Sequence, residues 1–406
     1  MKKIILNSLM FALVTGTTLF STSCKKESVQ PESKVSLDDV QRADIGDLAT
    51  LQFDADKFAG NIEAYMNGKV AGYGYTIFHK GEIYYRGTGG GGWARRPVDA
   101  PAVAHSAQQR QGIASSTKFV TALATIAILE KYNMLLNEPV YKYLPTNWKP
   151  SSSFKQLTFE RLLSHRTGLI NYGGDWAELK KTVEGPVKES EFANNTRTYN
   201  NVNFALLPII LPYVSAKKEF FSDYNVLKLL ESNPDEIYNA LGSRYVGIAR
   251  VNVFKPAGLM YWNVATFCPW NNNGIINPES GSKGYTTANG NEPGTTNGDS
   301  RRNGGAGGLY ISTAEFGRIQ NSAAQGLIVS SAGYQVMKSK LLGFDAVVSG
   351  KYGKYYWKNG GANNRETMIF DFGKTQVAVF ATSGTSEIGN KSSILVGAYE
   401  SAWIVK

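Results

Sequence analysis

A serine and a lysine three residues apart, Ser115 and Lys118, open a long segment without charge that runs from Phe119 to Leu129. This segment predicts a helix that is apolar on nearly every side and is therefore buried. At the start of a helix, the spacing places both side chains on one face, about one turn apart. Two polar side chains at a buried helix start require partners.

This pair of side chains can form a nucleophile. A serine hydroxyl attacks poorly until a base removes its proton, and a lysine amine can be that base only where its pKa is lowered. Burial, a second cation and the positive potential of a helix N-terminus all lower it. The alternative is an N-cap serine beside a solvated lysine.

Context distinguishes Ser115 from similar positions. The pattern Ser-x-x-Lys occurs five times, at Ser23, Ser115, Ser152, Ser215 and Ser280. The tetrapeptide alone therefore decides nothing. Only the Ser115 copy opens a long uncharged segment.

Composition excludes several classes of function. The 406 residues, 42% of them hydrophobic, suffice for one large two-lobed domain or two ordinary domains. The formal net charge is +10, but no run of Lys and Arg exceeds two residues, which argues against a nucleic-acid partner. The two cysteines and three histidines show no zinc-ligand spacing, and no Gly-x-Ser-x-Gly elbow supports a Ser-His-Asp triad. We expect no metal and no cofactor.

The N-terminus predicts export. Residues 1–24 begin Met-Lys-Lys, continue without charge, and end in small residues before Cys24. This pattern resembles a bacterial lipoprotein signal, in which the cysteine becomes the lipidated first residue. An ordinary cleaved signal and an uncleaved membrane anchor are the alternatives. We expect a polar tether at 25–50, a folded domain at 51–406, and a membrane-anchored lipoprotein of the cell envelope, in the periplasm or on the outer membrane.

The folded domain is predicted to mix strands and helices. Strands are expected at 72–78, 82–86, 367–372 and 376–381. Residues 89–92 are all glycine and lack a phosphate-loop ending, so they predict a flexible connection. A last helix is expected from about 392 to 403. The stretch 271–308, rich in Gly, Asn, Ser and Thr, is either a lid over a pocket or an idle surface loop.

Several segments together resemble a known family. The run IASSTKFVTALATIAILEKYNMLLNEPVYKYLP, followed by LTFERLLSHRTGL, resembles the serine β-lactamase-related family of penicillin-binding D,D-peptidases, class C β-lactamases and family VIII esterases. Its Tyr-x-Asn element is matched at 199–201, and its Lys-Thr-Gly element at 358–360. The resemblance covers roughly residues 52–404. It implies an α+β fold, with an antiparallel sheet flanked by helices and a second, mostly helical lobe.

The resemblance also implies catalytic roles. Ser115 would attack a carbonyl and form an acyl-enzyme, with Lys118 and Tyr199 sharing the proton transfers. Lys118 and Lys358 would depress each other's pKa, and their positive field would stabilise a phenolate at Tyr199. Which of Lys118 and Tyr199 is the general base stays open, because coupled groups titrate as a set.

The remaining site residues are implied in the same way. Substrate binding would fall to Asn201, Lys358, Asn359 and Gly360, and the oxyanion hole to the backbone N–H groups of Ser115 and Gly361. Asn359 departs from the family pattern, in which Thr or Ser commonly recognises a substrate carboxylate. Recognition of D-Ala-D-Ala and of β-lactams is therefore in doubt. His165, within the family-like segment, is expected to order a helix end.

We therefore expect an exported serine hydrolase that acts on an ester, an amide or a peptidoglycan-type peptide. The chain shows no glutamate motif of the class A type, so efficient penicillin hydrolysis is not expected. The alternative function is a catalytically silent binding lipoprotein with the same fold. Expected partners are a small-molecule or peptide substrate and, through the lipid on Cys24, a membrane.

Overall fold

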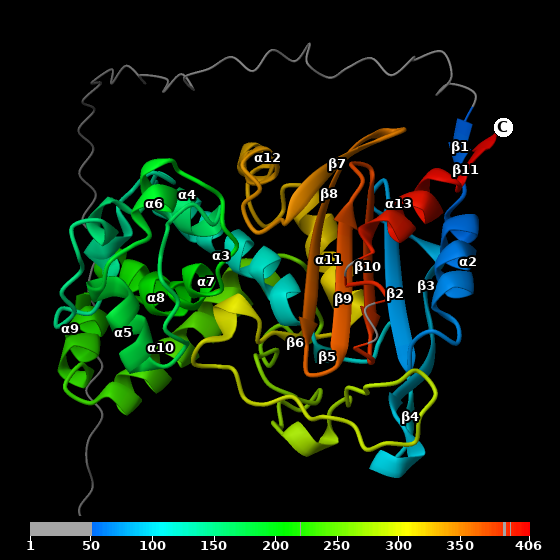
Figure 1. Ribbon diagram of the computed structural model, residues 1–406, viewed down its shortest axis with the longest axis horizontal. Coiled ribbons are helices and arrows are strands. Elements are labelled where there is room, and N and C mark those ends of the chain that lie inside the picture. Colours follow the sequence, from blue (N-terminus) through cyan, green and yellow to red (C-terminus); the bar gives the residue numbers. More distant parts are fainter. Residues whose placement is uncertain (1–50, 220, 385–386, 390) are drawn as a thin grey trace, which may run out of the picture. The chain divides into compact units, whose positions relative to one another are not determined.

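The computed structural model describes residues 51–406 except 220, 385, 386 and 390. The predicted signal peptide, Cys24 and the tether lie outside the described residues. Within them, seven antiparallel strands form the main sheet in the order β4-β3-β2-β10-β9-β8-β7 (Figure 1). These strands are β2 (Gly72–His79), β3 (Glu82–Arg95), β4 (Val103–Ala104), β7 (Ala346–Gly350), β8 (Gly353–Ala362), β9 (Arg365–Asp371) and β10 (Thr375–Ala381). Two short pairs join β1 (Leu51–Phe53) to β11 (Trp403–Val405) and β5 (Gln111–Gly112) to β6 (Tyr310–Ile311).

Helices cover both faces of the sheet. In β10, Val377 and Val379 belong to a core with α2 (Ala55–Met66) and α13 (Ser392–Glu400). The alternating residues Ala378 and Phe380 belong to a second core that includes α11 (Thr313–Ala324). Successive side chains of a strand point to opposite faces, so an unbroken apolar strand is buried on both sides.

A helical lobe packs beside the sheet (Figure 1). Its helices are α4 (Phe159–Leu163), α5 (Trp176–Glu184), α6 (Glu189–Ala193), α7 (Val202–Ala205), α8 (Leu207–Lys218), α9 (Phe221–Leu230) and α10 (Pro234–Ala249). Helix α3 (Thr117–Lys131) joins this lobe to the sheet and is buried along nearly its whole length, as its apolar sequence predicted. Helix α12 (Ser331–Ser339) precedes β7. In the part of the chain that the structure describes, no helix is both long and apolar enough to span a bilayer.

Two predicted elements differ from the structure. The glycine run 89–92 is not a flexible connection, because it continues β3 and pairs with β2. A Cβ on Gly90 would lie 2.4 Å from the Tyr73 carbonyl oxygen, so the absent side chains let the chain approach its neighbours closely. The last helix ends at Glu400, and Trp403 belongs to β11.

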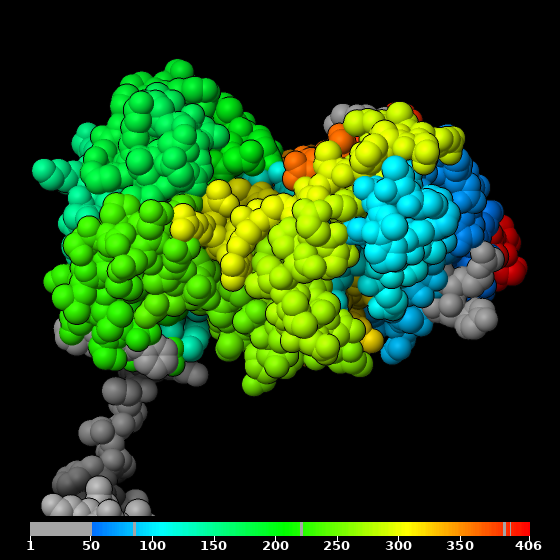
Figure 2. All heavy atoms as spheres, turned by 90° about the horizontal axis from the view of Figure 1, so that it is seen from below, coloured from blue at the N-terminus to red at the C-terminus, as the bar shows by residue number. Residues whose placement is uncertain are grey.

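The long stretch 271–308 is packed against the sheet and does not hang free. Buried Arg365 of β9 donates hydrogen bonds to the Ser282 and Thr295 carbonyls, each at 2.7 Å. Tyr285 is fully buried within this stretch. Figure 2 shows the segment in yellow-green and yellow, passing between the green helical lobe and the blue and cyan strands.

Strand β8 approaches the turn 114–116, which immediately precedes α3, unusually closely. A Cβ built on Gly360 would lie 2.4 Å from the Ile113 carbonyl oxygen and 2.9 Å from the Ser115 nitrogen. Gly361, the next residue, has open space: its nearest neighbour would be the Arg365 carbonyl oxygen at 3.9 Å. Glycine at 360 therefore permits contact between backbone and backbone.

Gly360→Ala should force β8 away from this turn and lower the free energy of unfolding by about 2 kcal/mol or more. Gly361→Ala is the matched control and should change it by less than about 0.5 kcal/mol. Urea unfolding of the two variants measures the difference. Equal stability of both variants would show that the turn moves freely.

Candidate active site

Ser115 lies in a one-turn helix, Ala114–Ser116, directly before α3. The preceding residue, Ala114, has a φ of 45°, a left-handed conformation that costs energy for a residue with a side chain. The sheet holds this turn in place, because the Ser116 and Thr367 hydroxyl oxygens are 2.7 Å apart. The strained backbone is thus supported from β9.

Lys118 is completely buried one turn after Ser115. Its Nζ lies 3.0 Å from the Ser115 Oγ and 2.8 Å from the Asn201 Oδ1. A third partner is the Ala306 carbonyl oxygen, at the end of the long stretch 271–308. The sequence prediction that Ser115 and Lys118 share a helix face is confirmed.

Tyr199 and Asn201 come to the same place from the helical lobe. The Tyr199 hydroxyl oxygen lies 2.7 Å from the Ser115 Oγ and 3.3 Å from the Asn201 Oδ1. The ring of His165 packs against the Tyr199 ring, with 4.6 Å between centroids. His165 Nδ1 accepts from the Asn200 backbone N–H at 3.2 Å, so this histidine orders the segment that carries Tyr199.

The protonation states follow from burial. Burial, and then the charge of Lys358, hold the pKa of Lys118 well below its ordinary value. Burial raises the pKa of Tyr199 to about 12, although its hydrogen bond with Ser115 acts in the opposite direction. This shift favours the phenol over the phenolate that the two lysines were expected to stabilise. Burial also holds the pKa of His165 well below its ordinary value.

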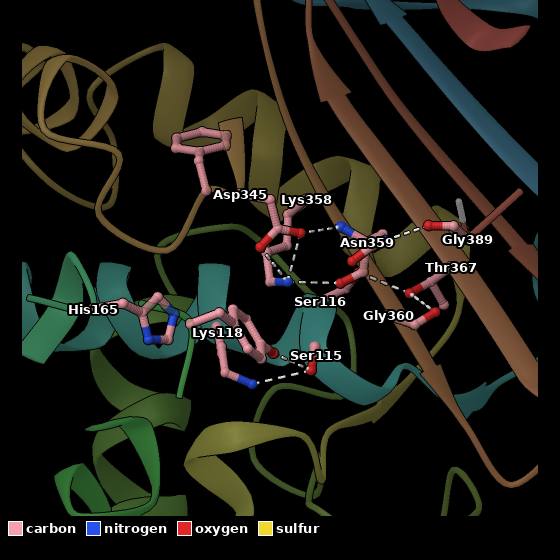
Figure 3. A network of polar contacts seen from close by, with 12 residues as sticks. Ser115, Ser116, Lys118, His165, Asp345, Lys358, Asn359, Gly360, Thr367 and Gly389 are labelled. Carbon is pink, nitrogen blue, oxygen red and sulfur yellow. Dashed lines mark hydrogen bonds and ion pairs between the residues drawn. The ribbon is translucent and has the colours of Figure 1, made fainter. Parts of the chain in front are cut away.

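Lys358 forms an ion pair directly above this group of residues (Figure 3). Its Nζ lies 2.9 and 2.8 Å from the two carboxylate oxygens of Asp345, and 2.9 Å from the Asn359 carbonyl oxygen. Lys358 and Lys118 both face the Tyr199 ring, at 5.2 and 5.0 Å from its centroid. The structure therefore brings Ser115, two amines and a phenol together.

Two residues that were predicted to bind substrate, Asn359 and Gly360, contact other parts of the protein. The Asn359 amide donates to the Gly389 carbonyl oxygen, on the side away from Lys118 and Ser115 (Figure 3). Gly360 is buried against the turn 114–116, where it serves close packing. Neither residue lines the cavity beside Ser115. Lys358 and Asn359 are successive residues of β8, so their side chains point to opposite faces of the sheet and cannot both enter one pocket.

The oxyanion hole was predicted from the backbone N–H groups of Ser115 and Gly361. The Asn359 N–H donates to the Asp345 carboxylate at 3.0 Å, on the side of β8 that faces away from β9. N–H groups two residues apart in a strand point the same way, so the Gly361 N–H points to this side as well. Gly361 and Ser115 both line the cavity.

A cavity of about 400 Å³ lies beside Ser115, and a smaller one of about 50 Å³ adjoins it. They share the residues Ala114, Ser300, Gly307, Gly308 and Ala362. The end of the 271–308 stretch thus forms part of the wall. Sequence reasoning missed the wall residues Asn171 and Asn303, which belong to no motif. It also missed Asp345, whose only signal was an isolated acid in an apolar stretch.

Comparison with known proteins gives partial matches to characterised relatives. Over 167 residues the chain is 27% identical to the teichoic acid D-alanine hydrolase of Staphylococcus aureus. The aligned residues make up 39% of this chain and 36% of that protein. The chain therefore matches about a third of the length of these relatives.

Solved structures show the same fold over most of the chain. FmtA from Staphylococcus aureus has a TM-score of 0.60 and 18% identity, covering 86% of both chains. The octameric penicillin-binding protein homologue of Pyrococcus abyssi has a TM-score of 0.58 and 19% identity, covering 84% of this chain and 77% of that one. The D-amino acid amidase of Ochrobactrum anthropi SV3 has a TM-score of 0.57 and 15% identity, covering 86% and 98%.

The sequence model of the family described as Beta-lactamase matches residues 58–383, most of the chain. The predicted β-lactamase/transpeptidase-like α+β fold is confirmed. The chain belongs to the Beta-lactamase family of serine hydrolases.

Proposed function

We propose that this protein is a serine hydrolase that forms an acyl-enzyme on Ser115 and then hydrolyses it, with an ester or amide as substrate. The observation that carries the proposal is the set of partners around Lys118. A neutral amine has two N–H donors and one lone pair. When Lys118 is neutral, the carbonyl oxygens of Asn201 and Ala306 can take its two donors, which leaves its lone pair for the Ser115 hydroxyl, whose oxygen lies 3.0 Å from the Nζ.

Lys118 is the general base in this proposal. The Ser115 proton passes to the Lys118 amine as the Ser115 Oγ bonds to the substrate carbonyl carbon. The backbone N–H groups of Ser115 and Gly361 stabilise the negative charge that develops on the carbonyl oxygen. An amine whose pKa is lowered by burial is neutral in enough molecules to accept the proton near neutral pH.

Tyr199 is the general acid. Its phenol keeps its proton because burial raises its pKa to about 12. At 2.7 Å from the Ser115 Oγ, it is close enough to protonate the leaving group as the bond to the acyl carbon breaks. A water molecule then takes the place of the leaving group and attacks the acyl carbon, and its proton restores the Tyr199 phenol. Lys118 returns its proton to the Ser115 Oγ as the bond to the acyl carbon breaks, so both groups regain their starting states.

The relatives support an ester or amide substrate. One is named as a hydrolase of D-alanine from teichoic acid, and another as an amidase of D-amino acids. Both names describe acyl transfer to water. For this chain, the two names support only a class of substrate, an ester or an amide.

We also propose that the protein is exported and anchored by lipid on Cys24. The support is the charge-free segment that follows Met-Lys-Lys and the small residues directly before this cysteine.

Covalent labelling tests the proposed enzyme. A fluorophosphonate probe should label wild-type protein on Ser115, and Ser115→Ala should lose both the label and ester turnover. The matched control is Ser152→Ala, which removes the serine of another Ser-x-x-Lys tetrapeptide and should keep both. Absence of label and turnover in folded wild-type protein would favour the silent binding protein instead.

The pH dependence tests the division of roles. Because the lowered pKa of Lys118 marks the loss of its proton, kcat/KM should rise with pH through that pKa and then reach a plateau. Lys118→Arg should lose about 10³-fold at every pH, since a guanidinium keeps its proton. Tyr199→Phe should lower the plateau about 10²-fold and leave the acid limb at the same pH. If the acid limb of the kcat/KM profile disappeared in Tyr199→Phe, the general base would instead be Tyr199.

Cell fractionation tests the anchor. The full-length chain should remain with membranes, and Cys24→Ser should appear in the soluble fraction, because only a cysteine accepts the lipid. The control is Cys268→Ser, which alters the other, buried cysteine and should stay with membranes. Membrane association of Cys24→Ser would contradict lipidation.

A further inference from the structure

The ammonium group of Lys358 has no hydrogen-bond donor left for a substrate. An ammonium carries three N–H donors. Two point to the carboxylate oxygens of Asp345 and the third to the Asn359 carbonyl oxygen, all at 2.8–2.9 Å. The side chain is 1% exposed, so the ion pair is held within the protein.

The N–H groups of Asn359, in its side chain and its backbone, also donate to acceptors within the protein. The Asn359 side chain donates to the Gly389 carbonyl oxygen, and its backbone N–H donates to Asp345. Asp345 therefore holds both Lys358 and the backbone of β8 in place. Neither the cation nor the amide of this strand is available to bind an anion beside Ser115.

The walls of the cleft are uncharged. Among the described residues that line the two adjoining cavities, none carries a charged side chain. The polar side chains of these walls are mostly amides, among them Asn171, Asn201 and Asn303. Arg197, the other cation near Asp345, donates to the Phe344 carbonyl oxygen at 2.8 Å and does not line either cavity.

A carboxylate that enters such a cleft leaves water without gaining a cation. Removing an ionised carboxylate from water is costly unless a charge partner or several donors replace the water. The Asp345–Lys358 pair carries no net charge, so Lys358 does not offset this cost. The cleft therefore discriminates against anions because its walls offer no free cation.

We propose that the Ser115 cleft selects esters and amides that have no carboxylate beside the scissile bond, and that the Asp345–Lys358 ion pair enforces this selection. The inference rests on the proposed hydrolase function and narrows its substrate class. It excludes peptides with a free C-terminal carboxylate next to the cleaved bond. Asp345 is a positioning residue here, because it acts through Lys358 and touches no substrate.

A matched pair of substrates tests the selection. The depsipeptide N-acetyl-D-alanyl-D-lactate has a leaving group with a carboxylate, and its C-terminal amide differs only in lacking that charge. Wild-type protein should cleave the neutral compound with a kcat/KM at least about tenfold higher. The neutral compound should also protect Ser115 better against the fluorophosphonate probe.

The variant Asp345→Asn tests whether the Asp345–Lys358 ion pair, and no other feature of the cleft, causes the preference for the neutral compound. Removing the carboxylate frees Lys358 donors and leaves the lysine charge unpaired, so the preference for the neutral compound should fall about tenfold. Asp223→Asn, a change at an exposed carboxylate of α9, should leave the preference unchanged. Circular dichroism checks that both variants are folded, and the wild-type comparison stands without them.

The outcomes distinguish the two proposals. Absence of any label on Ser115 would defeat the proposed function itself. A labelled Ser115 with equal or better cleavage of the anionic compound, or with cleavage of neither compound, would overturn this inference alone. An unchanged preference in folded Asp345→Asn would show that the ion pair does not set the selection.

Discussion

The site depends on one buried amine. Lys118 can remain at the start of α3 without solvent because three oxygen atoms surround it, from Ser115, Asn201 and Ala306. Those atoms come from the helix, the helical lobe and the end of the long loop. Since a buried polar group without partners is costly, the amine links the placement of all three segments. The same burial that makes the amine costly also lowers its pKa and makes it a base.

The two lysines of the site have different environments and therefore different properties. Lys118 faces neutral oxygen acceptors, whereas Lys358 faces the carboxylate of Asp345. A carboxylate partner favours the charged form of an amine, and carbonyl partners do so less. The arrangement thus holds one lysine as an ion pair and leaves the other able to exchange a proton with Ser115.

Sequence reasoning located much of this site because helix geometry is local. Ser115 and Lys118 lie on one face since they are three residues apart in a helix, and the capping box of Ser312 with Glu315 is equally local, because its two residues are three positions apart. Tyr199 could be predicted only from the order of family-like elements. The state of its proton, the partner of Lys358 and the direction of the Asn359 amide depend on residues distant in sequence. No pattern in the chain indicated those contacts, and for that reason Asp345 was missed.

The proposed mechanism requires Lys118 to be a neutral amine in the folded protein near neutral pH. Heteronuclear NMR of the lysine side chains, with Lys118→Arg to assign the signal, measures this directly. One lysine, Lys118, should show the Cε and Nζ shifts of a neutral amine at pH 7 and gain a proton only at lower pH. A Lys118 side chain that keeps its charge up to the ordinary lysine range, near pH 10.5, would contradict its role as the base.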